Sequence, residues 1–356
     1  MAECVFKTRR EDSCGIITEP GLLANVGLKL RCIDSEASQA VVIADRNVEA
    51  LYAKDLAASL AWAGFQCEVL TVTPGESSKS FPVAIHLWDK LVELGFSRRC
   101  VLIALGGGVV TDLTGFVAAA FMRGICYASV PTTLMAQLDA AVGGRVGVNH
   151  GRAKNLIGFI HHPLAVYNDP ILLTTLSQHD VRQGLAEAIK VAVIGSSGLF
   201  DYIEAHVNGL LKKEVDLLAE VVAQSIAVKC RLLEHGMHRI LNFGHVIGHA
   251  LETETSFEVT HGDAISIGMA TVTRCAKARG LLEEELAQRI RQLLSVAGLP
   301  TSTEKLDVSV DGIWEAMSFI RSGQNGQLHE VLPTAIGQCI VTDGFSKSDL
   351  QKHIFP

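Results

Sequence analysis

The sequence contains no long hydrophobic run, and this absence argues against a protein with membrane-spanning helices. Such a helix needs roughly 20 consecutive apolar residues, and no stretch here reaches even about 18. The first residues, MAECVFKTRREDSC, are charged and lack the apolar segment of a secretory signal peptide. We therefore expect a cytoplasmic protein that does not act at a membrane.

The sequence also lacks paired cysteines and an excess of basic residues. Its nine cysteines form no CxxC pair and no regular spacing, so we expect reduced thiols and no disulfide framework. The 31 Lys and Arg residues stand against 38 Asp and Glu residues, which gives a formal net charge of -7. Nucleic-acid binding normally needs a basic excess, so no nucleic-acid partner is expected. A local basic pocket for a small anionic substrate is compatible with this charge.

The first half of the chain alternates strand-like and helix-like segments. QAVVIADRN and QCEVLTVTPGE are typical of buried strands, and each precedes an amphipathic segment with helical periodicity. RRCVLIALGGGVVTDLTGFVAAAFM predicts a strand, a glycine turn and a helix, and ICYASVPTT a further short strand. This alternation indicates βαβ units with a mostly parallel, Rossmann-like sheet, whose ligands bind at the carboxyl ends of the strands.

After about residue 175 the periodicity becomes almost entirely helical. The spacing of apolar residues predicts helices over 179–195, 198–213, 214–234 and 265–282. A chain of 356 residues is long enough for two domains. We therefore predict an α/β domain over residues 1–175 and an all-α domain over residues 176–356, with the active site in the cleft between them.

Polar and glycine residues follow three successive predicted strands. GGGVVTD, residues 106–112, opens a helix after the strand VLIAL, an arrangement that lets backbone amides approach a phosphate. It is not the GxGxxG fingerprint, and alone it is equally consistent with a tight turn. Asp45 and Asn47 follow VVIA, and Glu76 and Lys79 follow EVLTVT. Ordinary loop polarity explains one such cluster, but three at successive strand ends indicate a nucleotide site.

The segment LNFGHVIGH places His245 and His249 four residues apart, on one face of a predicted helix. A single buried histidine is most simply a core residue bonded to a backbone carbonyl. Together with Glu187 and His261, however, these histidines could supply the nitrogen and oxygen ligands of a divalent metal with one position left open for substrate. Spacing alone does not decide which histidines bind, and the competitors are His150, His161, His162, His235 and His238.

Several blocks together resemble one family. GGGVVTDLTGF, MRG, VPTTLMAQLDAAVGG, GVNH, AKNLIG, GLAEAIK, LNFGHVIGHALE and HGDAISIGM occur in the order found in 3-dehydroquinate synthases, from about residue 40 to residue 337. The resemblance indicates the sugar phosphate cyclase superfamily. It implies a homodimeric enzyme that uses NAD and a divalent metal, usually zinc, with cobalt as an alternative.

The resemblance assigns the cofactor-binding residues. It implies that the metal is held by Glu187, His245 and His261. It implies that NAD lies along residues of the first predicted domain: Asp45, Asn47, Glu76, Lys79, Gly106, Gly107, Gly108, Asp112, Thr132, Thr133 and Lys154.

The resemblance also implies a reaction and its substrate contacts. The substrate would be 3-deoxy-D-arabino-heptulosonate 7-phosphate, cyclised to 3-dehydroquinate in the shikimate pathway through transient oxidation, phosphate elimination, reduction, ring opening and an internal aldol step. Arg123 would reach across the dimer interface into the neighbouring site. The remaining residues implied to act on the substrate are Asp139, Arg145, Asn155, Lys190, Lys229, Arg239, Asn242 and His249.

This sequence departs from the family pattern in three places. Arg145 replaces the lysine of the GGK block, His329 stands where a lysine is expected, and LLEHGMH shortens the segment before Arg239. These changes keep open a substrate without a carboxylate, sedoheptulose 7-phosphate, which related enzymes convert to valiolone-type cyclitols. Lys229 and Arg239 are the cations expected to hold a carboxylate, and their retention favours 3-dehydroquinate synthase.

Two other classes also fit part of the pattern. Metal-dependent alcohol dehydrogenases of the glycerol dehydrogenase type share the two-domain plan and the glycine turn, and they would release NADH as a product. A non-enzymatic relative, suggested by Arg145 and His329, would bind NAD and metal without turnover.

Overall fold

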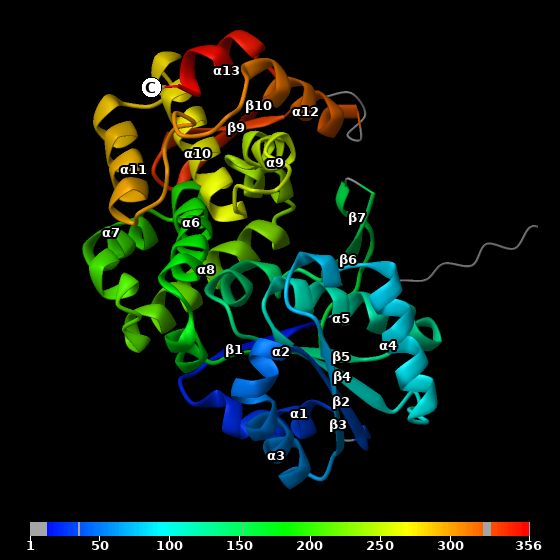
Figure 1. Ribbon diagram of the computed structural model, residues 1–356. Coiled ribbons are helices and arrows are strands. Elements are labelled where there is room, and N and C mark those ends of the chain that lie inside the picture. Colours follow the sequence, from blue (N-terminus) through cyan, green and yellow to red (C-terminus); the bar gives the residue numbers. More distant parts are fainter. Residues whose placement is uncertain (1–12, 35, 152, 323–328, 356) are drawn as a thin grey trace, which may run out of the picture. The chain divides into compact units, whose positions relative to one another are not determined.

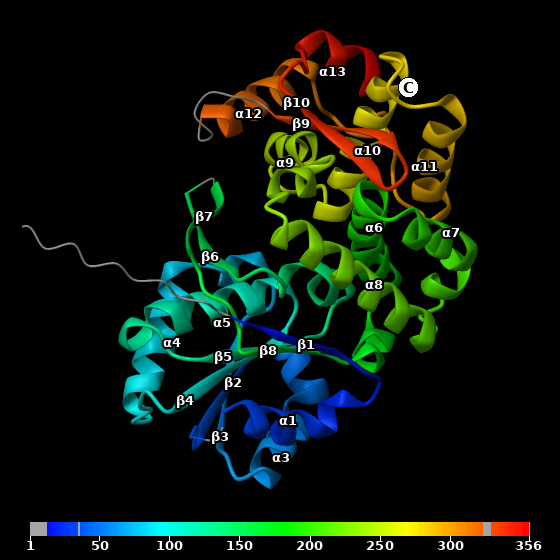
Figure 2. The same ribbon diagram turned by 180° about the vertical axis from the view of Figure 1, so that it is seen from behind.

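The computed structural model describes residues 13–34, 36–151, 153–322 and 329–355. Contacts divide the chain into two compact units, whose elements are shown in Figures 1 and 2. Unit 1 contains the described residues up to Ile17 together with Leu22–Pro131 and Gly143–Asn168. Unit 2 contains Thr18–Gly21, Thr132–Val142 and the chain from Asp169 onward. The long C-terminal part thus begins before the predicted boundary at residue 175, and Thr132–Val142 packs with it.

Unit 1 is built on a six-stranded sheet with the order β1-β8-β5-β4-β2-β3. The β2–β3, β2–β4, β4–β5 and β5–β8 pairs are all parallel, which confirms the predicted sheet. Every residue of β4 is buried, as expected for a central parallel strand covered on both faces. The strands are β1 (Gly15–Thr18), β2 (Gln39–Asp45), β3 (Gln66–Val72), β4 (Cys100–Gly106), β5 (Tyr127–Pro131) and β8 (Ala165–Asn168).

The connections place helices on both faces of this sheet (Figure 1). Helix α3 (Lys54–Trp62) leads from β2 outward to β3, whereas α4 (Phe81–Glu93) returns over β2 to β4 and α5 (Gly108–Ala120) continues to β5. Because parallel crossovers are right-handed, this reversal puts α3 on one face and α4 and α5 on the other. The chain therefore changes direction between β2 and β4, the place where open α/β sheets bind ligands.

An antiparallel hairpin in unit 1 was not predicted. Strands β6 (Arg145–His150) and β7 (Ala153–Ile160) pair antiparallel. A Cβ at Gly158 would lie 2.1 Å from the Val146 carbonyl oxygen, so only glycine permits this close approach. The remaining helical segments of unit 1 are η1 (Leu22–Asn25), α1 (Val26–Ile33), α2 (Arg46–Val48), η2 (Glu49–Ala53), η3 (Glu76–Ser78) and η4 (Phe121–Arg123).

Unit 2 is mainly helical, as predicted. Within the described residues, no helix has the combination of length and apolar composition that crossing a bilayer requires. The long helices are α6 (Gln178–Gly195), α7 (Ser197–Leu211), α8 (Val215–Glu234), α9 (His245–Glu254), α10 (His261–Ala278), α11 (Glu284–Val296), α12 (Val310–Ser322) and α13 (Lys347–His353). The short ones are η5 (Ala136–Ala140), η6 (Pro170–Thr175) and η7 (His238–Asn242).

The prediction that the second domain is all-α was wrong in one respect. Strands β9 (Glu330–Ala335) and β10 (Gln338–Thr342) form an antiparallel hairpin in unit 2. Val331 and Leu332 are buried, and the Gly337 amide donates to the Val193 carbonyl oxygen at 2.8 Å, which ties the turn to α6. An apolar run this short cannot be distinguished from a helix by periodicity alone.

Glycines bring the two histidine-bearing helices together. Gly244, which precedes α9, has a φ of 75°, and a Cβ at Gly268 of α10 would lie only 2.0 Å from the Gly244 carbonyl oxygen. A Cβ at Gly248 would lie 2.5 Å from the Ile265 side chain. The backbones of α9 and α10 therefore approach closely at the start of α9, which His245 begins, and in the second and third turns of α10, which His261 begins.

We expect Gly268→Ala to destabilise the protein because the new methyl group would collide with the Gly244 backbone. Overpacking of this kind costs roughly 1–3 kcal/mol. Gly198→Ala is the matched control, since the nearest atom to a Cβ there is the Ser196 Oγ at 3.9 Å. The free energy of unfolding, measured with urea for both variants, checks this expectation. Equal stability of the two variants would contradict the close packing of α9 on α10.

Candidate functional site

Three helices of unit 2 direct their side chains to one buried carboxylate. Glu187 on α6 is completely buried, and its Oε1 lies 3.3 Å from the Nε2 of His245 and 3.3 Å from the Nε2 of His261. The other ring nitrogen of His245 lies 3.2 Å from the Phe243 carbonyl oxygen. The structure therefore brings together the three residues for which the sequence suggested a metal role. Their nitrogen and oxygen donors match the preferences of zinc.

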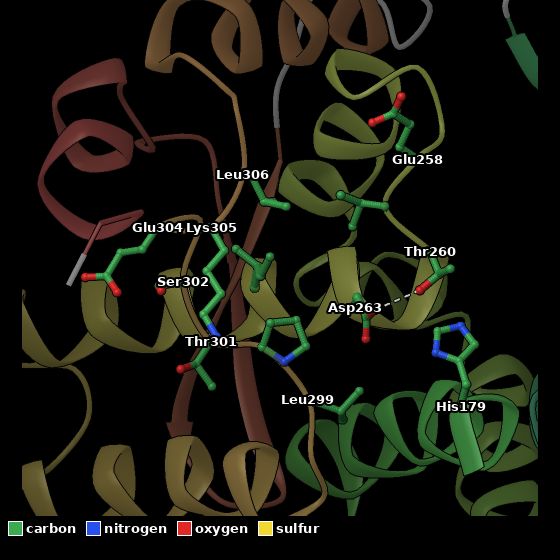
Figure 3. Close-up of a pocket in the computed structure, with 13 residues that line it drawn as sticks. His179, Glu258, Thr260, Asp263, Leu299, Thr301, Ser302, Glu304, Lys305 and Leu306 are labelled. Carbon is green, nitrogen blue, oxygen red and sulfur yellow. Dashed lines mark hydrogen bonds between the residues drawn. The ribbon is translucent and has the colours of Figure 1, made fainter.

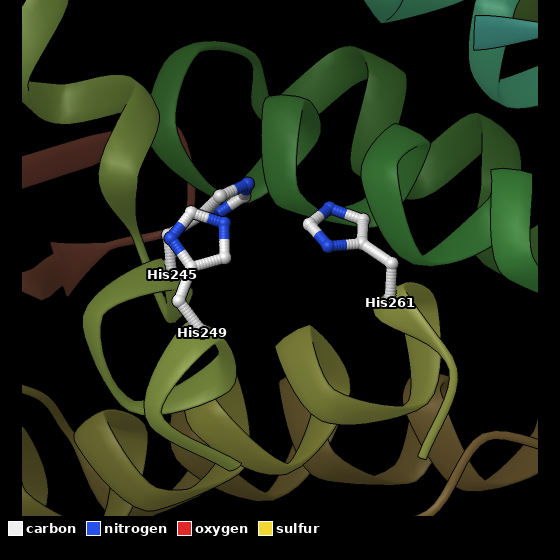
Figure 4. Close-up of side chains that lie close together, drawn as sticks. All are labelled: His245, His249 and His261. Carbon is white, nitrogen blue, oxygen red and sulfur yellow. The ribbon is translucent and has the colours of Figure 1, made fainter. Parts of the chain in front are cut away.

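His249 lies one turn after His245 on α9 and faces the same space (Figure 4). Its ring centroid lies 5.2 Å from that of His245 and 5.7 Å from that of His261. Ring nitrogens of the three histidines lie within 4.8 Å of one another. The cluster thus offers three imidazoles and one carboxylate, and His249 is geometrically available either as a ligand or as a group facing the substrate.

The competing histidines have other surroundings. His150, His161 and His162 belong to unit 1, and the His161 Nε2 lies 2.9 Å from the Ile125 carbonyl oxygen, as in an ordinary core histidine. His235 and His238 are exposed, as the sequence suggested for the EHGMHR segment. None of these five residues joins the cluster around Glu187.

Lys190 controls the charge of the cluster. Its Nζ lies 2.5 Å from the Glu187 Oε2, and both side chains are almost fully buried. Burial alone would raise the pKa of Glu187, but Lys190 and His245 outweigh it and hold that pKa well below its usual value. Burial, reinforced by Lys190, lowers the pKa of His245 despite the nearby Glu187. Glu187 is therefore an anion and His245 is neutral near pH 7, which are the forms that bind a metal.

His261 is held from both sides. Its Nε2 faces Glu187, and its Nδ1 lies 3.1 Å from the Oε2 of Glu252, which is only 3% exposed. Burial favours the neutral ring, but the two carboxylates outweigh it and raise the pKa of His261 to about 9. The sequence analysis did not assign Glu252. Its position seven residues after His245, on the same face of α9, was the signal that could have found it.

Two further predicted residues form a second buried pair. The Lys229 Nζ of α8 lies 2.6 Å from the Asp139 Oδ1, 2.5 Å from the Asp139 carbonyl oxygen and 2.9 Å from the Val142 carbonyl oxygen. Burial favours the neutral carboxyl, but Lys229 and Lys190 outweigh it and lower the pKa of Asp139 to about 2. The three donors of the Lys229 ammonium therefore have protein acceptors, although the sequence suggested it as a cation for a substrate carboxylate.

Two other predicted substrate residues of unit 2 lie just before α9, and His329, a departure from the family pattern, lies just before β9. Arg239 is exposed and Asn242 is partly buried, both in the turn η7 that leads to His245. His329, which stands where a lysine was expected, pairs through Nδ1 with Asp343. The Asp343 carboxylate therefore lies beside the imidazole at this position.

The predicted nucleotide residues of unit 1 gather at the carboxyl ends of β2, β3 and β4. The Asp45 side chain caps α2, accepting from the Asn47 amide at 2.9 Å and the Val48 amide at 3.2 Å. Gly106 ends β4, and a Cβ there would lie 2.7 Å from the Val110 side chain. Gly107 and Gly108 follow and open α5. The capping role explains Asp45 locally, whereas the Gly106–Gly108 turn offers a helix N-terminus at the switch point of the sheet.

Polar contacts link the remaining residues at this edge. Lys79, which is buried, forms an ion pair with Asp112. Asn149 donates to the Glu76 Oε1 at 2.8 Å and accepts from the Asn155 amide at 2.9 Å. The exposed basic residues of unit 1 that the sequence suggested are Arg123, Arg145 and Lys154.

Thr132 and Thr133 follow β5 but belong to unit 2. Thr132 is buried, and the Thr133 hydroxyl accepts a hydrogen bond from the Ala136 amide at 3.2 Å. The predicted NAD set is therefore divided between the two units. All three predicted metal ligands, in contrast, belong to unit 2.

Unit 2 also contains a separate pocket of about 530 Å³ near the start of α10 (Figure 3). Thr260 and Asp263, which flank His261 in sequence, line it, and the Thr260 hydroxyl donates to the Asp263 Oδ2 at 2.9 Å. None of the residues predicted to bind metal, NAD or substrate lines this pocket. Its size and hydroxyl groups alone do not define a ligand.

Family comparisons agree with this arrangement. A family model described as 3-dehydroquinate synthase N-terminal matches residues 69–183, and one described as 3-dehydroquinate synthase C-terminal matches residues 184–319. The chain belongs to the 3-dehydroquinate synthase family. The resemblance stated from the sequence blocks is thereby confirmed, and with it membership of the sugar phosphate cyclase superfamily.

Relatives within this family carry two different names. A 2-epi-valiolone synthase from Actinosynnema mirum is 40% identical over 350 residues, covering 96% of this chain and 91% of that protein. A 3-dehydroquinate synthase from Pelotomaculum thermopropionicum is 40% identical over 341 residues, covering 94% of this chain and 91% of that protein. Identity alone therefore does not separate the two activities.

A solved structure shares the fold over almost the whole chain. It is ValA, a 2-epi-5-epi-valiolone synthase from Streptomyces hygroscopicus subsp. jinggangensis with NAD+ and Zn2+ bound. It is 28% identical, with a TM-score of 0.89 and coverage of 98% of both chains. The fold of this chain is thus shared by a solved 2-epi-5-epi-valiolone synthase that has NAD+ and Zn2+ bound.

We expect Glu187→Gln to lower the pKa of His261 in metal-free protein from about 9 toward the ordinary 6.5, because the variant removes a charge and a charge-assisted hydrogen bond. Since the folded pKa is raised, the stabilisation from charged His261 is complete below about pH 6.5 and is lost as the pH rises through about 9. A ¹⁵N-imidazole NMR titration measures this pKa directly. Glu258→Gln, an exposed change of equal charge, should leave it unaltered; equal shifts in both variants would contradict the assignment.

Proposed function

We propose that this protein is an NAD- and metal-dependent 3-dehydroquinate synthase that cyclises 3-deoxy-D-arabino-heptulosonate 7-phosphate with loss of phosphate. The observation that carries the proposal is the buried Glu187 carboxylate shared by His245 and His261 beside Lys190. Family membership and a relative with bound NAD+ and Zn2+ support it. In this role the enzyme would act in the cytoplasmic shikimate pathway.

Glu187, His245 and His261 would hold the metal. The chemistry of this donor set fits zinc, because one anionic oxygen and two imidazole nitrogens leave one tetrahedral position open. A bound metal would act as a Lewis acid on a hydroxyl or carbonyl oxygen of the substrate. Lys190 keeps Glu187 ionised and brings a buried ammonium to the same place, where it can donate hydrogen bonds to an oxygen that gains negative charge.

NAD would lie at the carboxyl edge of the unit 1 sheet. The Gly106–Gly108 turn opens α5 there, and backbone without side chains lets a pyrophosphate come close. Asp45 and Asn47 at the end of β2, with the Lys79–Asp112 pair beyond β3, would contact the nucleoside part, and Glu76, Thr132, Thr133 and Lys154 would complete the set. A bound NAD would supply the hydride acceptor and donor that no side chain provides.

The remaining polar residues would bind and orient the substrate. Arg145, Asn155 and, from the neighbouring subunit of a homodimer, Arg123 would contact the phosphate. Arg239 and Asn242 in η7 would hold the carboxylate end, next to the helix that bears His245. His249 is exposed and close to both other imidazoles, so it can hold or return a proton. Asp139 would fix Lys229 in place.

A second substrate, sedoheptulose 7-phosphate, is favoured by specific observations. Lys229, one of the expected cations, already donates to Asp139 and Val142. A second expected cation is replaced by His329, which pairs with Asp343. The relative named 2-epi-valiolone synthase is as similar as the one named 3-dehydroquinate synthase. With this substrate the same residues would form a valiolone-type cyclitol.

We expect Glu187→Gln, His245→Ala and His261→Ala each to lose most of the bound zinc, because each removes one of three ligands. His249→Ala should retain it if His249 faces the substrate. Metal content after dialysis against a fixed free zinc concentration is the measurement. Full occupancy in the first three variants would refute the ligand set, and loss in His249→Ala would make that histidine a ligand.

We expect phosphate release from 3-deoxy-D-arabino-heptulosonate 7-phosphate with a kcat/KM at least tenfold above that for sedoheptulose 7-phosphate, because only the first presents a carboxylate to Arg239. Phosphate and NADH absorbance are followed together with NAD present. The reverse preference would establish the valiolone-type alternative. Stoichiometric NADH would instead indicate an alcohol dehydrogenase, and no turnover with either substrate would indicate a non-enzymatic relative.

A further inference from the structure

We propose that Glu252 and Gln183 are positioning residues that hold His261 for metal binding, and this inference rests on the proposed metal site. Neither residue is one of the three proposed metal ligands. Both are buried, however: Glu252 contacts the His261 ring, and Gln183 contacts the residues that follow His261. They come from α9 and α6, the helices that also supply His245 and Glu187.

Glu252 acts on the imidazole ring itself. Its Oε2 lies 3.1 Å from the His261 Nδ1, on the opposite edge of the ring from the Nε2 that faces Glu187. An acceptor at Nδ1 keeps the proton on that nitrogen and leaves the Nε2 lone pair for a metal. Carboxylate partners of this kind also fix the ring plane and raise the basicity of the ligand nitrogen.

Gln183 acts on the backbone that carries His261. Its Oε1 accepts from the Gly262 amide at 2.6 Å, and its Nε2 donates to the Asp263 Oδ1 at 3.0 Å. A Cβ at Gly262 would lie 2.7 Å from this Oε1, so the absence of a side chain there permits the contact. Gln183 therefore fastens the first turn of α10 directly to α6.

Gln183 lies four residues before Glu187, so both project from one face of α6. One helix thus supplies a ligand and, one turn earlier, a clamp on the helix that supplies another ligand. On α9, Glu252 likewise lies on the face that carries a proposed ligand, two turns after His245. Helices α6 and α9, which carry Glu187 and His245, therefore also fix the position of the His261 ring relative to the Glu187 carboxylate.

The decisive experiment compares zinc affinity, measured by chelator competition at one fixed pH, in the wild-type protein and in Glu252→Gln, Glu252→Ala and Gln183→Met. Losing such an outer partner typically weakens metal binding by roughly 10–100-fold. We expect Glu252→Ala to show the full loss and Glu252→Gln a smaller one, because the amide oxygen can still accept from Nδ1. The Co2+ visible absorption spectrum should change in Glu252→Ala, since it reports ligand geometry. Glu258→Gln, an exposed change of equal charge, is the control.

The outcomes separate this inference from the proposed function. Zinc affinities within twofold of wild type in all three variants, while Glu187→Gln loses zinc, would overturn the positioning role and leave the metal site intact. If Glu187→Gln also retains zinc, the proposed metal site itself fails. Should Glu252→Ala not fold, as judged by thermal unfolding of the metal-free protein, the isosteric Glu252→Gln and Gln183→Met decide the question.

Discussion

The structure of unit 2 depends on keeping one carboxylate, that of Glu187, charged in an apolar interior. An isolated buried charge costs several kcal/mol, so it persists only with close partners of opposite charge and with hydrogen-bond donors. Lys190 supplies the ion pair from the same helix, and His245 and His261 supply ring nitrogens from α9 and α10. The three helices must therefore meet at this point, and the glycines at 244, 248 and 268 allow α9 and α10 to pack closely enough.

The same charged groups also place Glu187 and His245 in the protonation states that bind a metal. Lys190 favours the ionised form of Glu187 and the neutral form of His245, so two donors need not lose a proton to a metal at neutral pH. His261 differs, because Glu187 and Glu252 hold a proton on its ring in the absence of metal. Binding of a divalent ion at this cluster would therefore release a proton from His261.

Substrate identity depends on the second buried pair and on charges at the periphery. The sequence pattern offers Lys229 and Arg239 as the two cations for a substrate carboxylate, but in the structure the Lys229 ammonium has Asp139 and Val142 as acceptors. Arg239 stays exposed in η7, and His329 is matched by Asp343. The positive charge available to an anionic substrate is thus smaller than the sequence pattern suggests.

Periodicity and turn residues, which are local properties, predicted most of the strands and helices of this protein from its sequence. The apolar run CVLIALG is typical of a strand covered on both faces, and the glycine turn after it marks the carboxyl edge of the sheet at Gly106. Local patterns could not distinguish the short β9–β10 and β6–β7 hairpins from other apolar runs. They also placed Thr132–Val142 in the first domain, because packing between distant segments leaves no periodic signal in the sequence. For the site, the sequence singled out Glu187, His245 and His261 as residue types suited to a metal. Only the tertiary structure decided that they converge, that Glu252 and Gln183 contact His261 and the residues after it, and that Lys229 pairs with Asp139. Each of these contacts joins different helices, most of them far apart along the chain.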